Sequence, residues 1–166
     1  MNTLNKYMIL GTIFVSVLGS LAHFFYDWTN NNAFVGLLTP INESTWEHMK
    51  LIFFPMLLFS VYIIPKIREI YPCITSAILS AILIGTWLVP VLFYTYTGII
   101  GRSILFVDVS IFYIAVIVAF YNAYRLTLSC KMDKFTNTLY ILLGVMFILF
   151  LTFTIFPPDI ALFAEQ

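Results

Sequence analysis

The sequence predicts an all-α membrane protein, a bundle of about five transmembrane helices. Of its 166 residues, 61% are hydrophobic and only 10% are charged, whereas about a quarter of the residues in a typical soluble domain are charged. The apolar residues form five stretches near the length of roughly 20 residues that crosses the hydrocarbon core of a bilayer. These stretches take up almost the whole chain. We therefore expect residues 1–166 to form a single integral membrane domain, with the lipid bilayer as its main partner.

We expect the five helices at residues 7–26, 46–64, 72–94, 103–124 and 135–156. One face of the first helix carries small and hydroxylated residues such as Ser16, Gly19 and Ser20, which let helices approach closely in lipid. The second helix begins with Ser44 and Glu47 at the spacing of a capping box, in which each side chain accepts from a free backbone N–H.

Prolines mark the later part of the chain. Pro55 lies inside the second predicted helix and Pro90 inside the third, and both predict kinks, because proline removes a backbone hydrogen bond. The fourth and fifth helices are predicted from the length of their apolar stretches. Pro157 and Pro158 end the fifth helix, and we expect the apolar tail after them to fold back onto the outer surface of the protein.

Basic residues in the short loops predict the orientation. One side holds six of them, the other two. The six are Lys6, Lys66, Arg68, Arg125, Lys131 and Lys134, and the two are Lys50 and Arg102. This count predicts a cytoplasmic N-terminus and an extracytoplasmic C-terminus in the cell membrane. Cys73 and Cys130 then lie on the reducing side, so we expect free thiols.

Ionisable residues gather at the predicted outer ends of the helices. His23 and Asp27 share one face of the first helix, Glu47 and His48 open the second, and Asp108 lies near the start of the fourth. At such depth each costs a few kcal/mol unless it is paired or faces a wet cavity. We therefore expect these five side chains to converge within about 10 Å of a common point.

Two imidazoles with several carboxylates suit zinc, manganese or iron. We expect His23, His48, Asp27 and Asp108 to bind such a divalent metal, with Glu47 or Asp27 as the base that activates water and Lys50 reaching toward the cluster. No metal motif on a single helix, such as His-Glu-x-x-His, supports this. Further polar candidates at the same end are Tyr26, Asn42, Glu43, Ser44, Tyr94, Arg102 and Asp159.

A purely structural interpretation competes with this one. Glu47 is explained by the capping box alone, and Lys50 and Arg102 by anchoring at lipid headgroups. Asp108 would then pair with one of these cations. His23 would serve as a hydrogen-bonding residue between helices. Together these interpretations describe a buried polar network that only fixes helix packing.

Several blocks of the sequence resemble an uncharacterised family of small bacterial multi-pass membrane proteins, domain-of-unknown-function family 6512. The resemblance rests on residues 23–29, 35–37, 93–98 and 156–158, and above all on the block Pro40-Ile41-Asn42-Glu43-Ser44-Thr45-Trp46-Glu47-His48. It spans nearly the whole chain. It implies a multi-pass protein of the bacterial cytoplasmic membrane, but no activity, cofactor or catalytic residue.

Three function classes remain open. The first is a metal-dependent membrane hydrolase or transferase that acts on an amphipathic or lipid-linked small molecule. The second is a small-solute transporter or an accessory subunit of one, although five helices give no inverted pair unless a homo-oligomer supplies it. The third is a structural or sensing protein. No phosphate-binding loop, nucleophile elbow, Cys-x-x-Cys or basic nucleic-acid surface is present, so we expect no nucleic-acid partner.

Overall fold

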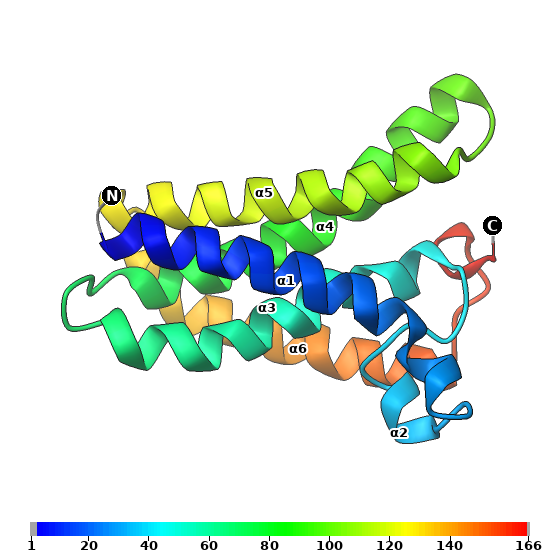
Figure 1. The fold of residues 1–166 in the computed structure, drawn as a ribbon, viewed down its shortest axis with the longest axis horizontal. Coiled ribbons are helices and arrows are strands. Elements are labelled where there is room, and N and C mark those ends of the chain that lie inside the picture. The colour runs from blue at the N-terminus through cyan, green and yellow to red at the C-terminus, as the bar shows by residue number, and fades with distance from the viewer. Residues whose placement is uncertain (1–2, 166) are drawn as a thin grey trace.

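A computed structural model describes residues 3–165 and is helical throughout its regular parts. The long helices are α1 (Thr3–Trp28), α3 (Thr45–Ile67), α4 (Ile74–Ile100), α5 (Leu105–Ser129) and α6 (Thr136–Ile155), the last preceded by the 3₁₀-helix η1 (Asp133–Phe135) (Figure 1). Five helices are long and apolar enough to cross a membrane, and residues 3–165 contain no strand. The predicted all-α class is therefore confirmed, and the number of candidate membrane spans agrees with the predicted five.

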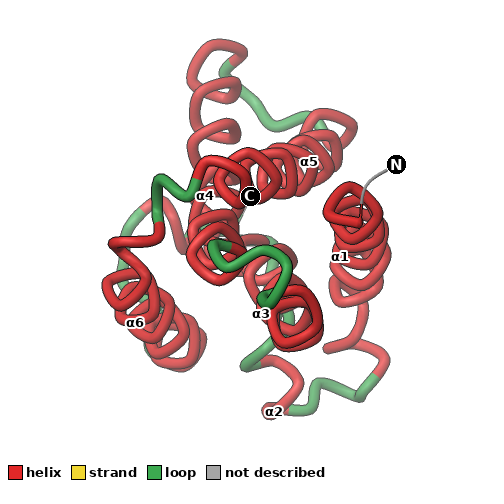
Figure 2. Tube along the Cα trace, turned by 90° about the vertical axis from the view of Figure 1, so that its left-hand side faces the viewer, coloured by secondary structure: helices red, strands yellow, loops and turns green. Residues whose placement is uncertain are grey.

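Helix α4 lies at the centre of the bundle and packs against α3, α5 and α6, while α1 covers a face made by α3 and α5 (Figure 2). The core is aliphatic and aromatic, with side chains such as Ile52, Phe53 and Ile82 fully buried. Close packing of α1 requires Gly19, since a Cβ there would lie 2.5 Å from the Leu51 carbonyl oxygen. The small-residue face of the first helix thus faces inward, as the sequence predicts.

Helices α4 and α5 extend five or six residues beyond their predicted ends. Helix α4 continues past Tyr94 to Ile100 and stops at Gly101, whose φ of 81° is the left-handed conformation typical of a helix end. Helix α5 continues past Tyr124 to Ser129 and stops at Cys130, with a φ of 53°. The predicted ends followed the apolar length of a membrane span, whereas the chain stays helical until a residue takes a left-handed conformation.

The connection between α1 and α3 folds over one end of the bundle. Asn30 and Asn31 adopt left-handed φ values of 55° and 58°, and the short helix α2 (Ala33–Gly36) follows. The predicted capping box is half formed. The Ser44 hydroxyl accepts from the Glu47 N–H, but the Glu47 carboxylate accepts from the Ile41 N–H, because Asn42 already accepts from the Ser44 N–H.

The C-terminal tail folds back onto this same end, as the sequence predicts. The 3₁₀-helix η2 (Ala161–Phe163) brings the Phe163 ring to 5.0 Å from the Trp46 ring and 5.4 Å from the Phe153 ring, centroid to centroid. The Tyr94 hydroxyl donates to the Ala161 carbonyl. The tail therefore covers the start of α3, which carries the candidate site.

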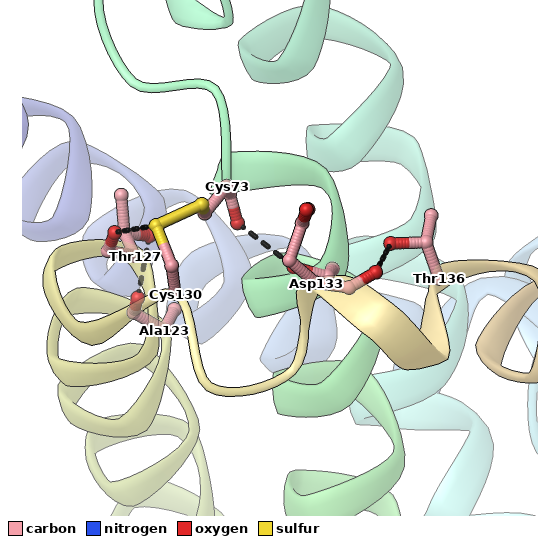
Figure 3. The surroundings of a disulfide bond; sticks show 7 residues. Cys73, Ala123, Thr127, Cys130, Asp133 and Thr136 are labelled. Carbon is pink, nitrogen blue, oxygen red and sulfur yellow. Dashed lines mark hydrogen bonds between the residues drawn. A yellow bond between two sulfur atoms is a disulfide. The ribbon is translucent and has the colours of Figure 1, made fainter.

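The two cysteines form a disulfide, so the expectation of free thiols was wrong. Cys73 precedes α4 and Cys130 follows α5, and antiparallel packing of these helices brings their Cα atoms to 5.3 Å, within disulfide range (Figure 3). The two cysteines are 57 residues apart in the sequence, and this separation gives no indication that they are close in space. Stable disulfides form in oxidising compartments. The bond and the count of basic residues thus favour opposite locations for this end of the bundle.

Candidate metal site

Three side chains converge at the end of the bundle opposite the disulfide: His23 near the end of α1, Glu43 in the loop before α3, and His48 in the first turns of α3. One ligand atom from each lies within 4.8 Å of the other two. A Glu43 carboxylate oxygen lies 3.4 Å from Nε2 of His48 and 3.6 Å from Nε2 of His23. Zinc bonds of about 2.1 Å at tetrahedral angles would separate donors by about 3.4 Å. We call these residues the triad.

The second ring nitrogen of His48 is already engaged. Nδ1 lies 2.9 Å from the Ser44 carbonyl oxygen. Because a carbonyl only accepts, Nδ1 carries the proton and donates. In the neutral form of the ring, Nε2 then carries the lone pair, and this atom lies 3.4 Å from the Glu43 carboxylate. A hydrogen bond from the other ring nitrogen is the arrangement that orients most metal-binding histidines.

The fold positions the triad through two helix ends. His23 is on the inward face of α1, and its ring centroid lies 5.3 Å from that of His48. Ser44 caps α3 and so fixes the turn that presents His48. Glu43 directly precedes this cap, and its side chain is 63% exposed, against 32% and 30% for the two histidines. The triad is thus open on one side, as a site that admits water must be.

Glu47 and Lys50 form a buried ion pair beside the triad. Lys50 Nζ lies 2.6 Å from the Glu47 carboxylate, and the two side chains are 0% and 3% exposed. Lys50 also donates to the carbonyls of Gly36 and Thr39. The ion pair therefore ties the loop after α2 to α3.

Asp108 and Asp27 line two different cavities that triad residues also line. Asp108, at the start of α5, lines a cavity of about 650 Å³ together with all three triad residues. Its carboxylate accepts a hydrogen bond from the Tyr96 hydroxyl, which in turn accepts from the Ile104 N–H. Asp27 lines a second cavity of about 260 Å³ with His23 and Glu43. His23 and Glu43 thus lie on the walls of both cavities.

The remaining sequence candidates are not part of the triad. Tyr26 and Asn42 line the smaller cavity, and Ser44 caps α3. Tyr94 contacts the C-terminal tail, while Arg102 and Asp159 are exposed. Asp108 pairs with a tyrosine rather than with Lys50 or Arg102.

The sequence analysis placed Glu47 in the catalytic machinery and Glu43 only among the further polar candidates. In the structure it is Glu43 that contacts both histidines. A signal was available, because Ser44 as the helix cap leaves the preceding residue outside the helix and free to turn back. Glu47, three residues after Ser44, instead pairs with Lys50, which also donates to the carbonyls of Gly36 and Thr39.

The fold and the triad define a class: a helical protein with five candidate membrane spans and a two-histidine, one-carboxylate cluster at one end of its bundle. Within this class, the chain belongs to the Family of unknown function (DUF6512), whose model matches residues 1–166. The family suggested by the sequence blocks is thereby confirmed. No curated protein and no solved structure matches the chain.

Proposed function

We propose that the triad binds a divalent metal, zinc, manganese or iron, and that the protein is a metal-dependent hydrolase or transferase for an amphipathic substrate at the membrane surface. The observation that supports this is the separation of the donor atoms, 3.4 and 3.6 Å from Glu43 to the two histidines, beside a cavity of about 650 Å³. Three protein ligands leave a coordination position for water, as in catalytic zinc sites.

A divalent metal held by His23, Glu43 and His48 would lower the pKa of a water molecule at the site toward about 7. Asp108 is the group proposed to accept the water proton, since it is the carboxylate outside the triad that lines the same cavity. Water deprotonated in this way would attack a carbonyl or phosphoryl centre of the substrate. The bond to the leaving oxygen breaks, and Asp108 returns the proton to that oxygen. In a transferase, an acceptor hydroxyl replaces water.

The sequence-based roles of Glu47, Lys50 and Asp27 are proposed here in revised form. The contacts of Glu47 with Lys50 and the Ile41 N–H favour a positioning role over that of a base. Asp27 shares the smaller cavity with His23 and Glu43, and is proposed to orient water entering there rather than to bind metal.

Metal content tests the proposal. Purified protein loaded with Zn²⁺, Mn²⁺ or Fe²⁺ and then desalted should retain about one metal per chain by mass spectrometry, because three converging ligands form one site. His23→Ala and His48→Ala should lose it. Asp159→Asn, an exposed carboxylate of the same end, is the control and should retain it. A folded wild-type protein that retains no metal under any loading would contradict the proposal.

We further propose that the triad faces the outside of a bacterial cytoplasmic membrane. The basis is the basic residues, six at the disulfide end against two at the triad end. The disulfide would then lie on the cytoplasmic side, where reductants keep most thiols reduced, so the pair would be oxidised only transiently in cells.

Cysteine labelling decides between the two orientations. In a Cys73→Ser/Cys130→Ser background, Asn31→Cys at the triad end should react with an impermeant maleimide in intact cells. Ser129→Cys, exposed at the other end, should react only after permeabilisation, because the membrane shields it. The opposite pattern would place the basic end outside and make a stable Cys73–Cys130 disulfide the expected state.

A further inference from the structure

The larger cavity combines an apolar inner wall with a mouth at the lipid-facing surface of the bundle. Leu51, Val89 and Ile111 line it and are only 5–8% exposed. Phe24, Leu105 and Val109 line it as well, yet are 48–78% exposed. A cavity whose lining runs from buried to strongly exposed apolar side chains opens sideways, between α1 and α5, where the hydrocarbon of the bilayer would lie.

The arrangement of the helices is consistent with this opening. The ends of α4 and α5 next to their connection diverge from α1 and α3 (Figure 1). Toward the middle of the bundle the gap is bridged by the Ser20 hydroxyl, 3.1 Å from the Tyr113 hydroxyl, and both residues line the cavity. Ser20 lies three residues before His23, about one helical turn toward the opposite end of the bundle. The mouth therefore ends about one helical turn from the triad, on the side of the disulfide end of the bundle.

The smaller cavity has a different character. Tyr26, Asp27 and Asn42 line it, together with His23 and Glu43. Asp27 is exposed and lies at the end of α1, beside the loop that leads to α2. Phe24, Pro40 and Ile41 complete its lining, so this cavity is mixed in character, and because His23 and Glu43 line both cavities, the triad lies between a mostly apolar cavity and a more polar one.

We propose that the larger cavity takes the acyl chain of a bilayer lipid, which enters sideways between α1 and α5, while water reaches the triad through the smaller cavity. The lipid's polar group would lie at the triad and its chain against the wall formed by Leu51, Val89 and Ile111. A volume of about 650 Å³ lies within the roughly 300–1,000 Å³ of sites for small molecules. The chemical step on this lipid rests on the proposed function; the binding of the chain does not.

Photo-crosslinking in vesicles tests this. The protein is reconstituted with phosphatidylglycerol and phosphatidylethanolamine, each bearing a diazirine in its acyl chain, and crosslinked residues are mapped by mass spectrometry. We expect adducts on Leu51, Val89 or Ile111, which lipids surrounding the bundle cannot reach. Val109→Trp should reduce these adducts several-fold by filling the mouth. Ile117→Trp, on α5 outside the cavity and 57% exposed, is the control and should leave them unchanged.

The outcomes separate this inference from the metal proposal. Adducts confined to exposed residues, or inner-wall adducts unaffected by Val109→Trp, would overturn the lateral lipid site even in a protein that retains metal. Inner-wall adducts in a protein that retains no metal would support the lipid site and leave the catalytic proposal without its metal. Metal content is measured on the same samples, and Val109→Trp should leave it unchanged.

Discussion

Replacing Lys50 with methionine should strongly reduce the yield and the thermal stability of the folded protein. The Glu47 carboxylate, 3% exposed, would lose its counter-ion, and the carbonyls of Gly36 and Thr39 would lose their donor. Removing one partner of a buried ion pair costs about 3–5 kcal/mol, because the other charge stays buried without compensation. The measurement is the unfolding temperature in detergent, followed by intrinsic tryptophan fluorescence, with monodispersity by size-exclusion chromatography.

The double variant Glu47→Gln/Lys50→Met is the informative comparison. It buries no net charge, and the oxygen of the introduced amide can still accept from the Ile41 N–H, so its unfolding temperature should lie well above that of Lys50→Met. Lys66→Met, an exposed lysine at the other end of α3, controls for loss of a positive charge and should behave as wild type. Equal stability of Lys50→Met and wild type would show that the pair does not hold the α2 loop in place.

Replacing Glu43 with glutamine should weaken metal binding by more than about 100-fold while leaving the fold intact, because changes to outer-shell partners alone typically cost about 10–100-fold. Glu43 supplies the charged ligand of the triad. Its side chain is 63% exposed, and surface substitutions usually change stability by less than about 0.5 kcal/mol. Isothermal titration with Zn²⁺ in detergent measures the affinity.

Glu69→Gln is the matched control, an exposed glutamate at the opposite end of the bundle, and should bind Zn²⁺ as wild type does. Glu47→Gln separates the two carboxylates of the same block. If Glu47→Gln abolished binding in a folded protein while Glu43→Gln left it unchanged, the ligand assignment would have to move from Glu43 to Glu47.

The block from Pro40 to Lys50 shows how much of the site was visible in the sequence. Its density of ionisable groups in an apolar chain marked it as the place to look, and helix spacing brought His23 toward the same end. The sequence did not show which glutamate of the block contacts the histidines and which pairs with Lys50. Glu43 and Glu47 are chemically alike, and the distinction depends on which lies before the cap at Ser44 and which turns toward Lys50.

The sequence by itself determined the class of fold, because apolar length and the scarcity of charge constrain any chain that must cross a bilayer. It also determined the close approach of α1, through Gly19, and the folding back of the C-terminal tail, although not its contact with the start of α3. These follow from local composition and from where helices must end.

Only the tertiary structure decided which side chains meet. The Cys73–Cys130 bond joins the start of α4 to the end of α5, and the triad joins α1 to the loop before α3. Asp108 reaches the same cavity from α5. Helical periodicity fixes the face of a residue on its own helix, but the rotation and neighbours of each helix result from packing over the whole bundle, which no single segment encodes.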